Sequence, residues 1–419
     1  MSENKNVKRQ QEAARAMQQK QKFDLKQYGM LIALGVIILF FYVLTGGKLL
    51  KPMNVSNLIF QNAYVIILAI GMLLCILTGG NIDLSVGSVV GLIGACAGTF
   101  IIEWGWNVYL SILLCLLIGI GIGMWQGFWI AYVGIPPFIC TLSGMLVFRG
   151  LCLLILNGMT LAPFPEAYQR LSTGFIPDIV EGFMVGGKKF NLLCMLVGVV
   201  LAVAFTASQF IANNSRRKKG YDYQPFTSII VKSAIISVVI IGVFYLLARY
   251  RGIPTVLIIL GILLAVYTFF TQKTVKGRHL YAIGGNMKAA RLSGIKTKQM
   301  MFFAYTNMSF IAAIAGLVFA ARLNSASPTA GQSFEMDAIA SCFIGGASAY
   351  GGTGTVGGAL IGAMIMGILN NGMSILGLNS NLQQVVKGLV LLGAVAFDVI
   401  SKNNLIQLPK FGKKKALAD

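Results

Sequence analysis

Long apolar runs recur along almost the whole chain, and they constrain the fold more than any single motif. About twelve runs approach the roughly 20 residues that an α-helix needs to cross a bilayer. With 56% hydrophobic and 11% charged residues, the chain lies far outside the composition of soluble domains, in which about a quarter of residues are charged. The sequence therefore predicts an all-α, polytopic transmembrane helix bundle. We place the runs at residues 28–46, 58–78, 86–102, 107–134, 138–157, 190–212, 229–248, 255–272, 300–322, 338–353, 356–376 and 382–400.

Two of these runs are short for a full span. Residues 86–102 and 338–353 are rich in Gly, Ser and Ala, so either segment can be re-entrant or broken. Irregular backbone at membrane depth persists only where protein or a water-filled cavity surrounds it. The sequence therefore predicts 10–12 spans.

The distribution of charge predicts the orientation of the chain. Of the 34 Lys and Arg residues, 24 lie in residues 1–28, 213–232, 273–299 and 401–419. Basic loops stay on the cytoplasmic side, and this explains the net charge of +21 better than a nucleic-acid surface does. Lys48, Lys51, Arg249 and Arg251 are exceptions, in short loops placed outside.

Alternating the spans from an internal N-terminus divides the chain as follows. Residues 1–27 form a cytoplasmic tail, 28–400 the transmembrane domain, and 401–419 a basic cytoplasmic tail. Residues 213–228 and 273–299 form cytoplasmic loops, and residues 158–189 the largest external loop. Both termini are expected in the cytoplasm.

An internal two-fold repeat is possible. The strings GSVVGLIGA at 87–95 and GTVGGALIGA at 354–363 share a Gly, hydroxyl, Val opening, and each follows a Gly-Gly loop. Transporters often contain two related halves around a central path. Glycine-rich apolar helices also resemble one another by composition alone, so both explanations stay open.

Catalytic and metal-binding patterns are thin. His279 is the single histidine, and seven cysteines are scattered through apolar runs without metal-ligand spacing. Residues 182–188 have phosphate-loop spacing, but Lys189 stands where a Ser or Thr should hold magnesium. We therefore expect no cofactor, no metal and no enzymatic activity in this chain.

Polar side chains at membrane depth are the candidate functional residues, because burying them is costly. Asn81, Asp83 and Ser85 interrupt two apolar runs within the string TGGNIDLS. The functional interpretation is a broken helix beside a translocation path, and the structural one is a turn in which Asp83 caps the next helix. Asn370, Asn371 and Gln383 are further path candidates, with interhelical hydrogen bonding as the alternative.

The loop from Lys273 to Lys298 carries seven Lys and Arg and no acid. It is also patterned like a short helix with small residues, which is typical of a docking surface. The sequence therefore predicts the site at which an energy source couples to the bundle. A loop anchored to anionic lipid headgroups is the alternative.

Three strings carry a resemblance to a known family: GGNIDLSVGS at 79–88, GRHLYAIGGNMKAARLSGI at 277–295, and GGASAYGGTGTVGGALIGA, which is followed by NNGMSILG and QQVVKGLVLLGAVAFDV. From about Tyr28 to Lys402, the chain resembles the permeases of bacterial monosaccharide ABC importers. The xylose and multiple-monosaccharide branch is the most similar, and the ribose and galactose permeases are more distant.

The resemblance implies a set of partners in the bacterial plasma membrane. It implies two cytoplasmic ATPase subunits that use ATP, an external sugar-binding protein, and surrounding lipid, with no nucleic acid. The permease core is expected to be homodimeric, with a second copy of this chain, or pseudosymmetric. The matching ATPase-coupling residues are Gly284, Gly285, Asn286, Ala289, Ala290, Ser293 and Gly294. Lys288 departs from the wider importer pattern, in which many members carry Glu, so no salt bridge through that Glu is expected.

The alternative function is an ion-coupled secondary transporter of small polar solutes. Proton or sodium coupling usually requires carboxylates within the membrane. Asp83 and Asp398 are the candidates for that role.

Overall fold

A computed structural model describes residues 25–178, 184–185, 188–220 and 225–402. Most of the predicted tails 1–27 and 401–419, and parts of the loops 158–189 and 213–228, lie outside the described residues. A two-residue hairpin, β1 (Met184–Val185) and β2 (Lys188–Lys189), accompanies the helices. The described helices are α2 (Leu25–Leu44), α3 (Pro52–Leu77), α4 (Val86–Gly98), α5 (Val108–Phe128), α6 (Pro137–Leu156), α7 (Glu166–Thr173), α8 (Leu192–Lys218), α9 (Phe226–Ala248), α10 (Val256–Lys273), α11 (Val275–Gly285), α12 (Met287–Leu292), α13 (Thr297–Leu323), α14 (Phe334–Ile344), α15 (Val356–Ile375) and α16 (Ser380–Lys402).

The described part of the chain holds ten helices long and apolar enough to cross a membrane, and the apolar stretch Gly29–Leu44 is a shorter one. The predicted all-α polytopic bundle is confirmed. Residues 86–103 reach spanning length because a π-helical segment, Thr99–Glu103, continues α4. Residues 338–353 form no single spanning helix, since α14 ends at Ile344 after 11 residues.

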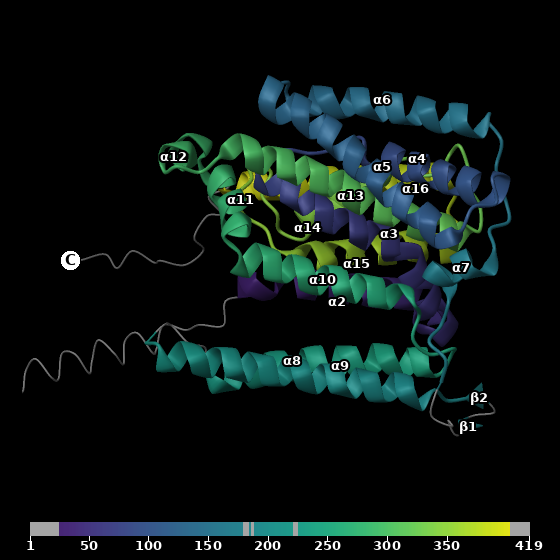
Figure 1. Cartoon of the computed structure of the whole chain (residues 1–419). Helices are drawn as coiled ribbons and strands as arrows, with labels where there is room; N and C mark the ends of the chain where they lie inside the picture. Colours follow the sequence, from purple (N-terminus) through teal and green to yellow (C-terminus); the bar gives the residue numbers. More distant parts are fainter. Residues whose placement is uncertain (1–24, 179–183, 186–187, 221–224, 403–419) are drawn as a thin grey trace, which may run out of the picture.

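Helix α3 lies at the centre of the bundle and packs against α13, α14 and α15 (Figure 1). Helix α13 in turn contacts α4 and α5. Glycines permit this close packing: a Cβ at Gly71 would lie 2.8 Å from the Met308 sulfur, and one at Gly123 would lie 2.6 Å from the Thr306 Cα. Small residues at helix contacts are the usual way in which membrane helices approach closely.

Figure 1 places α12 at one end of the bundle and α7 at the other, and we call these the α12 end and the α7 end. Helix α3 starts at the α7 end and finishes at the α12 end, where the Leu77 carbonyl accepts a hydrogen bond from the Gly352 N–H. Helix α13 runs the other way, and near its finish the Leu317 carbonyl accepts a hydrogen bond from the Tyr168 hydroxyl of α7.

Two irregular segments, residues 78–85 and 324–333, each lead into a short helix, α4 and α14. Helix α14 begins halfway along α3, because the Phe334 ring stacks on Tyr64 with centroids 3.8 Å apart. The two short helices meet near their first turns: a Cβ at Gly331 would lie 2.0 Å from the Gly87 carbonyl oxygen. The predicted repeat pairs residues of α4 with those of α15, helices of 13 and 20 residues, and it stays a prediction.

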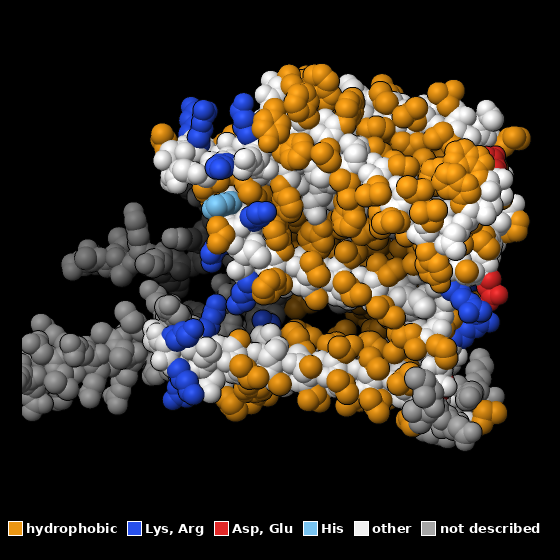
Figure 2. All heavy atoms as spheres, viewed as in Figure 1, with side chains coloured by type: hydrophobic (Ala, Val, Ile, Leu, Met, Phe, Trp, Pro, Cys, Tyr) orange, Lys and Arg blue, Asp and Glu red, His pale blue; other side chains and the backbone are white. Residues whose placement is uncertain are grey.

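Helices α8 and α9 form a hairpin beside this body. They pack mainly against each other, and a Cβ at Gly198 would lie 2.5 Å from the Phe244 Cβ. The hairpin is fixed at its base, where the Asn191 N–H donates to the Ala248 carbonyl at 3.0 Å. Figure 2 shows an opening between the middle part of the hairpin and the body.

Candidate functional site

The predicted coupling loop folds into two short helices, α11 and α12, at the end of the bundle. The Thr274 hydroxyl caps α11 by accepting from the Gly277 N–H at 3.0 Å. The Asn286 Oδ1 caps α12 by accepting from the Ala289 N–H, also at 3.0 Å. Such caps satisfy backbone donors that a helix start leaves free. Residue Asn286 therefore defines where the second helix begins.

The base of this region is tied firmly to the body. At Gly284 a Cβ would lie 2.0 Å from the Leu77 carbonyl oxygen and 2.2 Å from the Gly352 nitrogen. The Tyr281 hydroxyl donates to the Gly354 carbonyl at 2.9 Å. A movement of α11 therefore reaches both the end of α3 and residues 345–355, which link α14 to α15.

Most of the predicted coupling residues lie on the outer surface of α12 or in the turns directly before and after it. Exposed members are Gly285, Asn286, Ala289, Ser293 and Gly294. Gly284 is half-buried, and Ala290 is 5% exposed and packs into the hydrophobic core of its own chain. These last two residues hold the loop in place.

Sequence reasoning missed the largest apolar projection on this surface. Leu292 is 89% exposed at the last position of α12, and Met287 is 44% exposed at the first. Lysines and arginines cluster around them at this end (Figure 2). An isolated Leu inside a basic, small-residue string is the signal that would have identified it.

The predicted path residues Asn81, Asp83 and Ser85 form a local network near the α12 end. Buried Asp83 accepts hydrogen bonds through Oδ1 from the Ser85 N–H at 2.8 Å and the Ser85 hydroxyl at 2.7 Å. Its Oδ2 has no hydrogen-bond partner in the described part of the chain. The Gln126 amide donates to the Ser85 hydroxyl at 2.6 Å. Asn81 bonds back to Thr78. These contacts fix the segment that precedes α4.

The other predicted path residues lie toward the α7 end. Asn371 of α15 donates to Gln61 Oε1 at 3.2 Å and exchanges hydrogen bonds with Asn54, both on α3. Gln383 donates to the Leu378 carbonyl. Thr78, which Asn81 contacts at the end of α3, and Asn54, which Asn371 contacts near its start, are 24 residues apart. These two contact points are therefore about 35 Å apart along the bundle.

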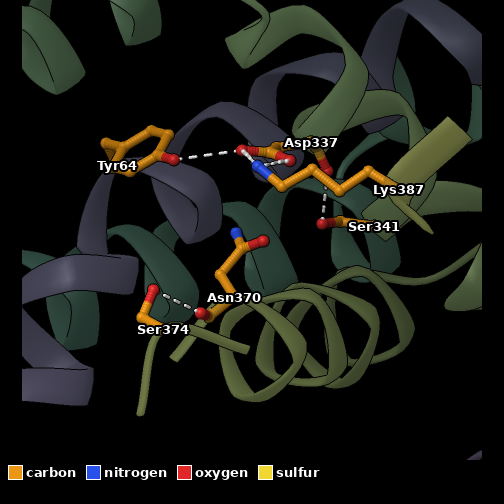
Figure 3. Close-up of polar contacts among 6 residues, drawn as sticks. All are labelled: Tyr64, Asp337, Ser341, Asn370, Ser374 and Lys387. Atoms are coloured by element: carbon orange, nitrogen blue, oxygen red, sulfur yellow. Dashed lines mark hydrogen bonds and ion pairs between the residues drawn. The ribbon is translucent and has the colours of Figure 1, made fainter. Parts of the chain in front are cut away.

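A buried ion pair lies between these groups (Figure 3). Lys387 Nζ of α16 is 2.9 Å from Asp337 Oδ1 of α14, and the Tyr64 hydroxyl donates to Asp337 Oδ2 at 3.0 Å. The Asp337 side chain is 1% exposed. Asn370, a predicted path residue, lies beside the pair in Figure 3, and its buried Oδ1 has no partner among the described residues.

Asp337 did not stand out in the sequence, which directed attention to Asp83 and Asp398 as intramembrane acids. The Asp398 carboxylate instead accepts from the Ala349 N–H at 3.1 Å. Lys387 gave the missing signal, because a lysine within an apolar span needs an acidic partner. A search for acids in the neighbouring spans would have reached Asp337.

Comparisons with known proteins place the chain in a family. The family described as "Branched-chain amino acid transport system / permease component" matches residues 54–395. The xylose transport system permease protein XylH of Haemophilus influenzae is 39% identical over 91% of this chain and 98% of the relative. The ribose import permease protein RbsC of Bacillus subtilis is 33% identical over 89% and 93%. The chain belongs to this permease family, and the resemblance predicted from its motifs is confirmed.

A second xylose permease, XylH of Escherichia coli, is 39% identical over 90% of this chain and 93% of its own length. No solved structure matches the fold.

Proposed function

We propose that this chain is the membrane-spanning permease of an ATP-driven importer for monosaccharides, either xylose-like sugars or several sugars. The family match and the near full-length similarity to xylose and ribose permeases carry the proposal. The chain supplies the path and the alternation between its two openings. ATP is bound and hydrolysed by partner subunits, so the permease itself is a transport subunit and not an enzyme.

The proposed orientation puts the α12 end in the cytoplasm. Basic loops favour the cytoplasmic side, and the α12 end carries the loop with seven Lys and Arg. The chain is then a multi-pass protein of the bacterial plasma membrane with both termini inside. The α7 end faces the external sugar-binding protein.

Coupling to the ATPase subunits follows from the shape of α12. Exposed Leu292 and Met287 offer an apolar projection, and Ala289, Ser293 and Gly294 let a partner surface approach closely. A buried apolar anchor surrounded by polar groups is the usual form of an interface centre. The surrounding lysines and arginines complement an acidic groove. A second permease copy and lipid complete the proposed environment.

The transmission step uses contacts within the chain. ATP-driven closure of the ATPase subunits moves α12, and α11 passes the movement to the end of α3 and to residues 345–355. Residues 345–355 directly follow α14, and Asp337 of α14 forms an ion pair with Lys387 of α16. The bundle thereby has a continuous connection from the docking surface to its buried ion pair.

The ion-coupled alternative is not favoured. It requires an intramembrane carboxylate that exchanges protons or sodium. Asp337 is engaged by Lys387 and Tyr64, and Asp398 accepts from the Ala349 N–H, whereas Asp83 is bonded through Oδ1 alone. The family match also points to the importer.

The test is a pull-down of the tagged permease from its native cells in mild detergent, with a sugar-stimulated ATPase assay. Leu292→Arg should lose most of the bound ATPase subunit. The control, Met159→Arg, replaces another exposed apolar residue, outside the coupling loop, and should keep it. Leu292 is a cleaner probe than Gly294, whose φ of +85° makes any side chain strained. Full recovery and coupling in Leu292→Arg would overturn the docking assignment.

A further inference from the structure

An aromatic cavity at the α7 end has no part in the coupling scheme. Its volume is about 280 Å³, and its walls include Phe60 of α3, Phe175, Tyr250 and Arg322 of α13. A neighbouring cavity of about 300 Å³ shares Phe175, Tyr250 and Arg251 with it. The two cavities adjoin at these three residues, and we call them together the recess. Each of them is close to the low end of the 300–1,000 Å³ typical of ligand pockets.

The walls of the recess are held by backbone hydrogen bonds and not by side chains alone. The Ile176 N–H donates to the Ile253 carbonyl at 2.9 Å, and the Thr255 N–H donates to the Gly174 carbonyl at 2.9 Å. These bonds join the segment after α7 to the segment before α10. The rings and charged groups of the recess are therefore set on a fixed frame.

Three rings supply an apolar surface to the recess. Phe60 and Phe175 meet edge to face with centroids 5.5 Å apart, and Phe175 contacts Tyr250 at 6.2 Å. The Arg251 guanidinium lies 5.8 Å from the centroids of both Phe175 and Tyr250. Ring faces of this kind suit the C–H face of a pyranose, and the arginine remains a donor.

Unused hydrogen-bonding groups line the same space. The Arg322 side chain is half-buried and makes no hydrogen bond or ion pair with a described residue. The same holds for the Asn57 side chain. Both carboxylate oxygens of Asp178 are buried and have no hydrogen-bond partner among the described residues. Asn191 and Gln61 each accept one hydrogen bond through the side-chain oxygen, while their amide nitrogens have no acceptor among the described residues.

Buried polar groups are normally paired, so the two carboxylate oxygens of Asp178 indicate an absent ligand or water. The half-buried side chains of Arg322 and Asn57 are available to the same ligand. Sugar hydroxyls both donate and accept, and they fit a site that combines a carboxylate with guanidinium and amide donors. An anionic solute would pair with the arginines but would be repelled by Asp178. A neutral polyhydroxylated ligand uses every group present.

We propose that this recess is an external monosaccharide subsite, which receives sugar before it enters the bundle. The proposal rests on the importer function proposed above and adds a binding place on the permease itself. Asp178 and Asn191 contact one side of the sugar, Arg322 and Asn57 the other, and the rings carry its apolar face. The polar stripe Asn54, Gln61 and Asn371 continues from the recess along α3.

Cysteine protection tests the subsite directly. All seven native cysteines, each within the described residues, are buried, so a membrane-impermeant maleimide will report an introduced thiol. Asn57→Cys places that thiol in the recess. The matched control, Met159→Cys, places one in an exposed position outside it. Labelling is followed in proteoliposomes with D-xylose, with gluconate as an anionic analogue, and with glycerol.

The expected result is specific protection. Because a pocket covers most of its ligand's surface, saturating D-xylose should slow labelling of Asn57→Cys about fivefold, and glycerol and gluconate should leave the rate unchanged. Adding Arg322→Gln should remove the protection, and Met159→Cys should be labelled equally in all conditions. Protection by gluconate alone would replace the sugar site with an anion site.

A parallel uptake assay separates the two proposals. Suppose that the wild-type importer takes up D-xylose, that Asn57→Cys is unprotected, and that Arg322→Gln leaves the KM for uptake unchanged. This result would reject the subsite and keep the importer. Absence of any sugar uptake by the complete wild-type system would reject the importer function itself. Wild-type uptake together with protection supports both.

Discussion

Helix α3 and the α8–α9 hairpin are equally apolar in sequence but have opposite surroundings. In the most apolar 18-residue window of α3, 83% of residues are buried within the protein, against 17% in α8 and 11% in α9. Helix α3 is enclosed by other helices, while most side chains of the hairpin are exposed on the surface of this chain. Hydropathy therefore identifies a span without telling which solvent, protein or lipid, will surround it.

Polar and small residues make the difference between the two regions. Helix α3 carries Asn54, Gln61, Asn62 and Tyr64, each bonded to another part of the chain. In the hairpin, Thr206 and Ser237 form a polar link between α8 and α9. A helix that is committed to protein neighbours uses side chains that lipid cannot satisfy. The comparison predicts that substitutions at buried positions of the body lower the stability more than substitutions on the hairpin do.

The largest effect is expected at the buried ion pair. Asp337→Leu leaves Lys387 uncompensated, and breaking a buried pair in this way costs about 3–5 kcal/mol. The thermal midpoint of the purified permease should fall sharply. Adding Lys387→Leu should restore most of the loss, because two apolar side chains replace a pair that is costly to bury. If the double variant has the same low thermal midpoint as Asp337→Leu, the ion pair stabilises the folded permease by more than the cancellation of two buried charges.

A smaller effect is expected from overpacking a glycine of the body. At Gly123 a new side chain meets the Thr306 backbone, whereas at Gly242 of α9 it meets nothing within 4 Å. Overpacking typically costs about 1–3 kcal/mol, so Gly123→Val should lower the thermal midpoint. Gly242→Val, the same change on the hairpin, should leave it nearly unaltered. Similar losses in both variants would remove the distinction between body and hairpin.

The smallest effect is expected on the lipid-facing surface of α9. Val238 is largely exposed, and Val238→Ala should change the stability by no more than about 0.5 kcal/mol, as for other surface substitutions. Thermal melting in the same detergent provides the measurement. A clear loss would show that α9 has a protein neighbour in the assembled importer, and a second permease copy would then be sought there.

Much of the fold could be predicted from the sequence, because span length and charge bias are local properties. The apolar runs anticipated the spanning helices within a few residues, and the short Gly-rich run at 338–353 correctly raised the possibility of a broken helix. The partner of Lys387 could not be read in the same way. Asp337 lies 50 positions away, and only the packing of α14 against α16 joins them.

The candidate site divides in a similar manner. The basic string 273–298 predicted a short helix, and the structure has two, α11 and α12, with the coupling residue Asn286 as the cap of the second. Which face of that helix points outward depends on α3 and on residues 345–355, so Ala290 could not be distinguished from Ala289 in advance. The recess at the α7 end escaped notice because its walls come from five separate segments of the chain.

The backbone hydrogen bond between Asn191 and Ala248 brings the two ends of the hairpin together, so the hairpin can be removed from the chain as one unit. Its entry and exit lie side by side, and it contains two crossings, so excision changes neither the spacing of the remaining chain nor the side on which later segments emerge. A gene in which the codon for Asn191 is joined to that for Ala248 should still specify the central bundle. The same junction is a natural place to insert a foreign pair of spans.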